Sequence, residues 1–213
     1  MKKTVLLLCA NILFANIYGQ NQDYNSKMAK NILLIETAKT VSDFQILANT
    51  FAVISDSDKN EWLPLYYAAQ ATILRAQVET DDDKTDIYLD QAQKYLDQAM
   101  NLKSDESELI VLQGFLHQSR IKVSPMSRGQ KYSTMAYELF EKAKTLNSEN
   151  PRIYFLEAMN VMNTPKMFGG GNKNALPLFQ KADEKFKNFV PLTPISPNWG
   201  NENNQEQLSL CIK

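Results

Sequence analysis

Apolar residues along most of the chain recur at every third or fourth position, which is the spacing of one face of an α-helix. This spacing begins near residue 28 and continues to about residue 188. One such face consists of Trp62, Leu65, Tyr66, Ala69, Ile73 and Ala76. The strict alternation of apolar and polar residues that marks a half-buried strand is missing from the sequence. The pattern therefore predicts an all-α protein.

Residues that form turns and helix caps divide this pattern into separate helices. We expect eight of them, at residues 28–40, 43–55, 61–78, 85–102, 106–122, 129–146, 151–163 and 174–188. The segments 81–83, 104–105 and 147–150 supply polar caps and turns. Pro151 suits the first position of a helix, and Pro64 and Pro177 are expected in first turns, where the missing N–H costs little. The sequence thus predicts a row of helical hairpins.

The second helices of three successive hairpins share a spacing of small, bulky and small residues. The three sets are Ala92/Leu96/Ala99, Ala136/Phe140/Ala143 and Ala175/Phe179/Ala182. The first helices carry a bulky residue followed four positions later by a small one, as in Leu65/Ala69, Ile110/Gly114 and Tyr154/Ala158. In these positions the chain resembles the tetratricopeptide repeat (TPR) family, in which small residues let neighbouring helices approach each other closely.

The resemblance covers about residues 60–190, and a diverged copy would lie at 28–58. It implies a right-handed solenoid of three to four TPR-like hairpins. The repeats are longer than the standard length of about 34 residues, which indicates that they are degenerate. Another solenoid of helical hairpins, or an irregular helical bundle, remains an alternative because such alanine spacing is common in packed helices.

The amino terminus has the features of a secretory signal peptide. Lys2 and Lys3 precede an almost wholly apolar stretch at 4–15, and a small residue, Gly19, stands before Gln20. We expect cleavage after residue 19, export to the periplasm or the medium, and no stable membrane insertion afterwards. The alternatives are an uncleaved anchor and a buried amino-terminal helix. The apolar stretch is short for an anchor, because spanning a bilayer takes about 20 apolar residues.

The carboxyl-terminal residues 191–213 differ in composition from the helical domain at 20–190. The segment 191–197 is rich in proline, Trp199 follows it, and a short helix is expected at about 202–212. We interpret this tail as a cap with Trp199 as its anchor, since the last unit of a repeat protein leaves an apolar face uncovered. The alternative is that the proline-rich segment is itself a ligand for another protein.

Candidate chemistry is sparse. The chain has 23 basic and 24 acidic residues, mixed along its length, which argues against a nucleic-acid partner. Its one histidine, His117, is far in sequence from Cys211, and we expect neither catalysis, nor a cofactor, nor a metal site. The acidic segment 81–90 lacks the glycine and glutamate of a calcium loop. Gly169–Gly171 precede a helix and either bind an anion or form a turn with positive φ in which Phe168 packs inward.

The expected function is therefore that of a non-enzymatic scaffold that binds a protein or peptide in a concave groove. First helices line such a groove, and their polar or amphipathic residues are the candidate contacts. These are Tyr67, Gln70, Gln113, His117, Gln118, Glu157, Asn160 and Asn163. The alternative is a periplasmic carrier of a small or apolar ligand, accessory to a transporter. Its pocket would be closed by the tail and the glycine loop and lined by Tyr66, Tyr67, Tyr154, Phe155 and Phe168.

Overall fold

The computed structural model describes residues 23–212, and the predicted signal peptide at 1–19 lies outside them. Residues 23–37 form the first helix. It is followed by α2 (Val41–Ser57), α3 (Trp62–Val78), α4 (Asp82–Leu102), α5 (Ser107–Ile121), α6 (Pro125–Leu146), α7 (Pro151–Asn163), the short 3-10 helix η1 (Lys166–Phe168), α8 (Asn172–Asn188) and α9 (Asn201–Ile212). No strand occurs in this range. The all-α prediction is confirmed, and the expected helices agree with the observed ones to within a few residues.

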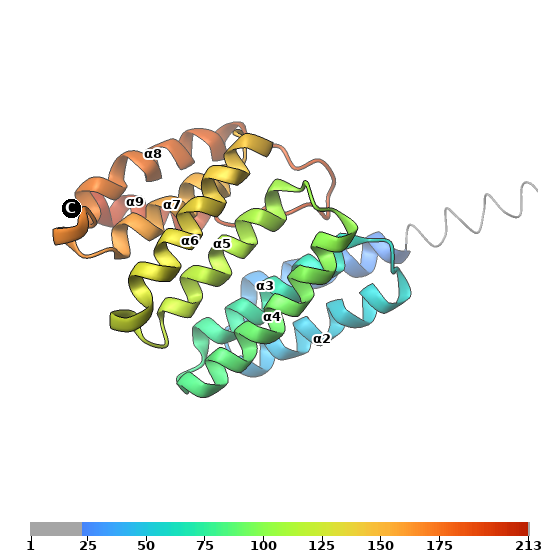
Figure 1. Ribbon diagram of the computed structural model, residues 1–213. Coiled ribbons are helices and arrows are strands. Elements are labelled where there is room, and N and C mark those ends of the chain that lie inside the picture. The colour runs from blue at the N-terminus through green and yellow to red at the C-terminus, as the bar shows by residue number, and fades with distance from the viewer. Residues whose placement is uncertain (1–22, 213) are drawn as a thin grey trace, which may run out of the picture.

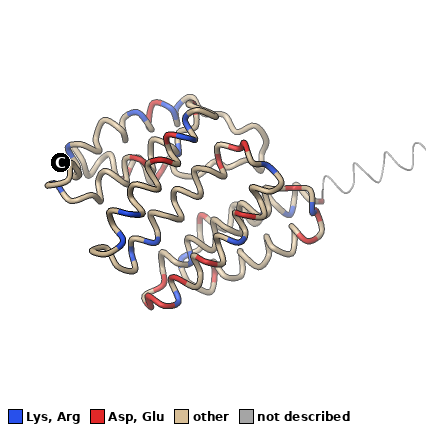
Figure 2. The backbone as a smooth tube through the Cα atoms, in the orientation of Figure 1, with Lys and Arg blue, Asp and Glu red and all other residues tan. Residues whose placement is uncertain are grey.

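Three antiparallel hairpins, α3–α4, α5–α6 and α7–α8, stand side by side (Figure 1). The first helix of each hairpin contacts the first helix of the next, so that α3, α5 and α7 form one layer. Helix α2 packs on α3, and α9 packs on α8. Basic and acidic positions are mixed along the helices in Figure 2. The right-handed sense of the repeat stays a prediction.

The shared small and bulky positions explain why the hairpins pack so closely. All nine residues of the repeated pattern in α4, α6 and α8 are fully buried. Gly114 of α5 shows the steric reason, because a Cβ atom at this position would overlap the ring of Phe140 in α6. The small residues thus make room for the bulky ones on the facing helix.

Helix ends follow the expected chemistry with one exception. Asp81 caps α4 by accepting a hydrogen bond from the Lys84 backbone N–H at 3.1 Å, and Pro64 lies in the first turn of α3. The prediction for Pro177 was wrong, because α8 already begins at Asn172 and the proline lies inside the helix. The carbonyl of Lys173 therefore lacks its helical partner, but both residues are exposed, so water can satisfy it.

The tail runs back across the molecule from the end of α8 to α3, and only then forms α9 (Figure 1). Ile195 is buried in the core around α3, and its carbonyl accepts a hydrogen bond from the Tyr67 hydroxyl at 2.9 Å. At the other end, buried Asn204 of α9 donates to the carbonyl of Phe179 in α8 at 3.2 Å. The tail therefore joins α3 to α8, instead of covering only the last hairpin.

Candidate functional site

A concave pocket with a volume of about 450 Å³ lies among the first helices of the three hairpins. Helix α3 contributes Gln70, Leu74 and Gln77; α5 contributes Phe115, Gln118, Ile121 and Lys122; and α7 contributes Phe155, Leu156, Met159, Asn160 and Asn163. Trp199 of the tail and Asn203 of α9 complete the wall. Most of the wall thus comes from α3, α5 and α7, the first helices that the sequence analysis expects to line a groove.

The two ends of the pocket differ in chemistry. Phe115, Phe155 and Trp199 give one end an aromatic wall. Toward the carboxyl ends of the helices, the lining contains the amides of Gln77 and Asn163 beside Ile121 and Lys122. On α3 the lining residues extend over two turns, or about 10 Å of helix axis. Such a pocket suits an amphipathic ligand with its apolar part at the aromatic end.

The one charged residue in the described lining of the pocket, Lys122, is already engaged. Its ammonium group donates hydrogen bonds to the carbonyls of Ala76 and Gln77 at 3.0 and 2.8 Å, and to that of Glu79. These are the carbonyls at the carboxyl end of α3, where a cation is favourable. Lys122 thus caps α3, and the remaining lining is uncharged.

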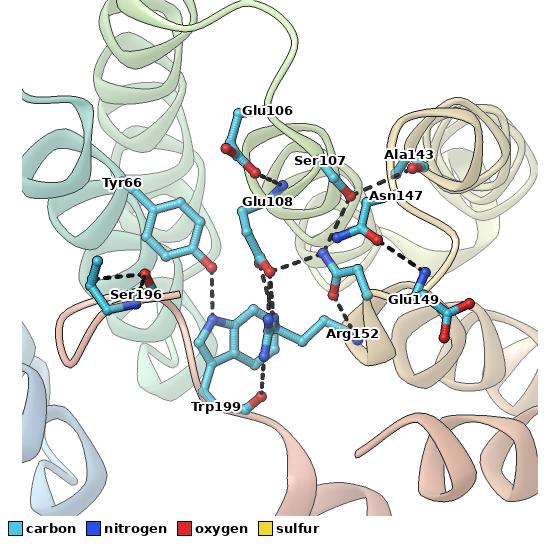
Figure 3. A network of polar contacts seen from close by, with 12 residues as sticks. Tyr66, Glu106, Ser107, Glu108, Ala143, Asn147, Glu149, Arg152, Ser196 and Trp199 are labelled. Atoms are coloured by element: carbon cyan, nitrogen blue, oxygen red, sulfur yellow. Dashed lines mark hydrogen bonds and ion pairs between the residues drawn. The ribbon is translucent and has the colours of Figure 1, made fainter. Parts of the chain in front are cut away.

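A polar network holds Trp199 in the pocket wall (Figure 3). The indole Nε1–H donates to the Tyr66 hydroxyl at 2.7 Å, and the Trp199 carbonyl accepts from Arg152 Nη1 at 3.4 Å. The indole also lies against Phe115, with ring centroids 6.1 Å apart. Trp199 is thereby fixed from α3, α5 and α7, the same helices that form the rest of the pocket.

Arg152 itself is completely buried, and its charge is balanced by buried Glu108. The Arg152 Nε donates to both Glu108 carboxylate oxygens, at 3.1 and 2.9 Å, and Nη2 donates to Oε1 as well. Asn150 Nδ2 adds a hydrogen bond to the carboxylate at 2.9 Å. Burial alone would lower the pKa of the Arg152 guanidinium, but the adjacent carboxylate raises it above its ordinary value. The guanidinium therefore stays charged and continues to hold the tail.

Four of the eight residues predicted as groove contacts line the pocket. They are Gln70, Gln118, Asn160 and Asn163. The other four do not line this pocket. Tyr67 is buried against Phe51 in the core, with ring centroids 5.3 Å apart.

The remaining three residues outside the lining contact second helices. Gln113 exchanges hydrogen bonds with Gln93 of α4. His117 stacks on Tyr132 of α6, with ring centroids 5.6 Å apart. Glu157 forms an ion pair with Lys144 of α6 at 2.8 Å. These three residues lie on the side of α5 or α7 that packs against a second helix. The residue types on that side do not differ from those on the groove side, so the sequence alone does not distinguish the two sides.

The aromatic residues expected for a carrier pocket are only partly in place. Phe155 lines the pocket, and Tyr66 supports it through Trp199. Tyr154 instead donates to the Ser148 carbonyl at 3.0 Å. Phe168 was expected to pack inward, but it is 73% exposed because η1 carries it outward. Gly169 and Gly171 have the expected positive φ, and no residue of their loop lines the pocket.

Sequence reasoning missed several lining residues. Trp199 was recognised as an anchor of the tail but not as a wall of the site. Phe115 belongs to a stripe with Gln118 and Lys122 at helical spacing, and this signal was present in the sequence. No such spacing in the sequence indicates where the tail lies on the other helices.

Two features bear on membrane and metal sites. Within residues 23–212, none of the helices combines the length and the hydrophobicity needed to cross a membrane. The same part of the chain contains no group of three or more His, Cys, Asp and Glu side chains that could hold a metal ion.

Comparisons with known proteins extend this picture. No family model matches the chain, and no curated protein matches it either. Among solved structures, the chain is similar to the HusA haemophore from Porphyromonas gingivalis, with 28% identity and a TM-score of 0.79 over 88% of this chain and 92% of the other. It is also similar to a thermophilic TPR protein from Thermus thermophilus, with 14% identity and a TM-score of 0.56 over 93% of this chain and 94% of the other. The chain therefore has the helical-repeat fold that a TPR protein and a haemophore share.

Proposed function

We propose that the protein is a non-enzymatic carrier that binds a flat, largely apolar ligand of the haem type in the pocket among α3, α5 and α7. The observation that carries the proposal is the partly aromatic lining of this pocket, in which Trp199 is fixed and the one charged residue, Lys122, is bonded to the end of α3. The similarity to a haemophore along nearly the whole of both chains supports the same assignment. The export predicted from residues 1–19 suits a carrier that meets its ligand outside the cytoplasm.

The lining residues indicate how such a ligand would be held. Among the described residues of the pocket wall, there is no histidine, cysteine or tyrosine, and Met159 supplies the sulfur-containing side chain. Histidine is the commonest metal ligand in proteins. Binding would therefore depend mainly on burial of the macrocycle and on stacking against Trp199, and Met159 is the lining side chain that could coordinate iron. The carboxylates of the ligand would lie in solvent at the polar end of the pocket.

The test is an absorbance titration of the chain beginning at Gln20 with haemin and, separately, with iron-free protoporphyrin IX. We expect saturable binding of both, with one ligand per chain. Trp199→Ala should weaken both complexes, because it removes an aromatic wall of the pocket. As a control, Trp62→Ala removes the other tryptophan, which lies outside the pocket lining. The proposal fails if the unaltered chain binds neither porphyrin.

A second candidate function is the scaffold expected from the sequence. The observation that favours it is the similarity to a TPR protein, together with a groove lined by first helices. A peptide partner would contact the polar end of the pocket at Asn163 and Gln77. Crosslinking of the chain in envelope extract, followed by mass spectrometry, separates the two functions. A saturable protein partner that porphyrin does not displace would favour the scaffold.

A further inference from the structure

One buried polar group in the pocket lacks a partner. Gln70 is only 4% exposed, and its Oε1 atom is buried without any hydrogen bond. Buried polar atoms are nearly always hydrogen-bonded in native proteins, because an unpaired one costs stability. A few other buried side-chain atoms in the described part of the chain also have no hydrogen-bond partner. Gln70 is the one residue among them that lines the pocket.

The other amides around the pocket are either paired within the protein or exposed to solvent. Gln118 donates to the Leu156 carbonyl at 2.7 Å, and Gln77 donates to the Ser119 hydroxyl at 2.7 Å. Asn160 donates to the carbonyl of Ser133 at 3.1 Å and accepts from its hydroxyl at the same distance. Asn163 and Asn203 are exposed to solvent. The unpaired state of Gln70 is therefore a property of this residue and not of pocket amides in general.

The position of Gln70 places it at the aromatic end of the pocket. It lies one helical turn after Tyr66, whose hydroxyl accepts the Trp199 indole hydrogen bond at 2.7 Å. Leu74 lies one turn further along the same face and also lines the pocket. An acceptor at this place would lie near the part of a ligand that the aromatic wall covers.

We infer that Gln70 is a specificity-determining residue of the pocket, which accepts a hydrogen bond from a donor in the apolar part of the ligand. This inference rests on the proposed carrier function. In a porphyrin, the donors within the macrocycle are the pyrrole N–H groups of the iron-free ring, or a water molecule bound to the metal. Gln70 would thus distinguish a macrocycle with a central donor from a purely apolar molecule of similar size.

This role predicts opposite effects on stability and on binding when the amide is removed. Gln70→Met keeps the length of the side chain and removes its polar atoms. The free protein should become more stable, with Tm raised by about 2–6 °C, because an unpaired buried acceptor is gone. Affinity for protoporphyrin IX should fall by about three- to tenfold, since the hydrogen bond to the ligand is lost.

Gln113→Met is the matched control. Gln113 is also a buried glutamine, but it is paired with Gln93 and lies outside the pocket lining. This variant should lower Tm and leave the dissociation constant unchanged. The contrast between the two variants separates a general effect of replacing glutamine from a contact with the ligand.

The measurements are thermal unfolding without ligand and fluorescence titration with iron-free protoporphyrin IX, with haemin as a second arm. If Gln70→Met loses affinity for both porphyrins, Gln70 accepts a hydrogen bond from the pyrrole N–H of the iron-free ring and from the metal-bound water of haemin. If it loses affinity for the iron-free ring alone, the donor is the pyrrole N–H. If Gln70→Met raises Tm but leaves both affinities unchanged, the buried acceptor does not contact the ligand and the inference is overturned. If the unaltered chain binds neither porphyrin, the carrier function itself fails, and the inference with it.

Discussion

The buried ion pair between Arg152 and Glu108 gives the strongest stability prediction. Arg152 is 0% exposed and Glu108 is 8% exposed, so removal of either partner leaves the other charge without compensation inside the protein. Arg152→Met keeps most of the side-chain volume and leaves the buried Glu108 carboxylate without its cationic partner. Breaking a buried pair in this way costs about 3–5 kcal/mol. The loss of the hydrogen bond to the Trp199 carbonyl adds to this cost and should loosen the pocket wall.

The double variant Glu108→Leu with Arg152→Met tests the origin of that cost. Replacing both partners by apolar residues removes the stranded charge, and such replacements are often neutral or stabilising. Asn150 would lose its bond to the carboxylate but keep its contact with the Ser107 hydroxyl at 3.3 Å. We therefore expect the double variant to recover at least about 2 kcal/mol of the single loss.

The assay is urea unfolding followed by circular dichroism, with ΔG extrapolated to water for the unaltered chain, both single variants and the double variant. A cost below about 1 kcal/mol for Arg152→Met would show that the pair is not buried as described. A double variant no more stable than Arg152→Met would show that the stranded charge is not the cause. Either result would refute the account of how the tail is held.

Three further predictions concern helix packing, pH dependence and ligand binding. Gly114→Ala should lower the free energy of unfolding by about 1–3 kcal/mol, because its Cβ overlaps the Phe140 ring, and Phe140→Leu in the same chain should recover part of the loss on thermal unfolding. Burial and the nearby charges of Arg120 and Lys131 lower the pKa of half-buried His117 to about 4, so its contribution to stability is present above pH 6.5 and is lost as the pH falls toward 4. After allowance for solvent screening, the unaltered chain should lose about 1 kcal/mol more than His117→Gln between pH 7 and pH 5 in urea unfolding, and equal losses would contradict this. Haemin and iron-free protoporphyrin IX should bind with dissociation constants within about tenfold of each other in the absorbance titration, and a requirement for iron would contradict binding by burial and stacking.

The helices and their pairing were predictable because their signals are local. The spacing of Ala136, Phe140 and Ala143 specifies a face that must be buried, and all three residues are buried. Cap residues such as Asp81 bonded as expected. The error at Pro177 has a local cause too, because Gly171 with φ of 95° lets the helix begin earlier than the polar pattern indicates.

The candidate site was only partly predictable because it depends on which side of each helix faces the groove. Gln118 and His117 are adjacent in sequence, yet one lines the pocket and the other stacks on Tyr132. Both are polar residues of α5, so composition cannot separate them. Trp199 was recognisable as a large anchor, but its place in the wall depends on long-range bonds to Tyr66 and Arg152. Those bonds join segments that no local pattern connects.

The measurement that tests the central claim most directly is tryptophan fluorescence of the Trp62→Phe variant during titration with protoporphyrin IX. The chain contains two tryptophans, so this variant reports on Trp199 alone. The account predicts saturable quenching with one porphyrin per chain, because the ligand would lie against the indole in the pocket wall. Saturable binding by absorbance without any change in Trp199 fluorescence would place the ligand elsewhere and contradict the account.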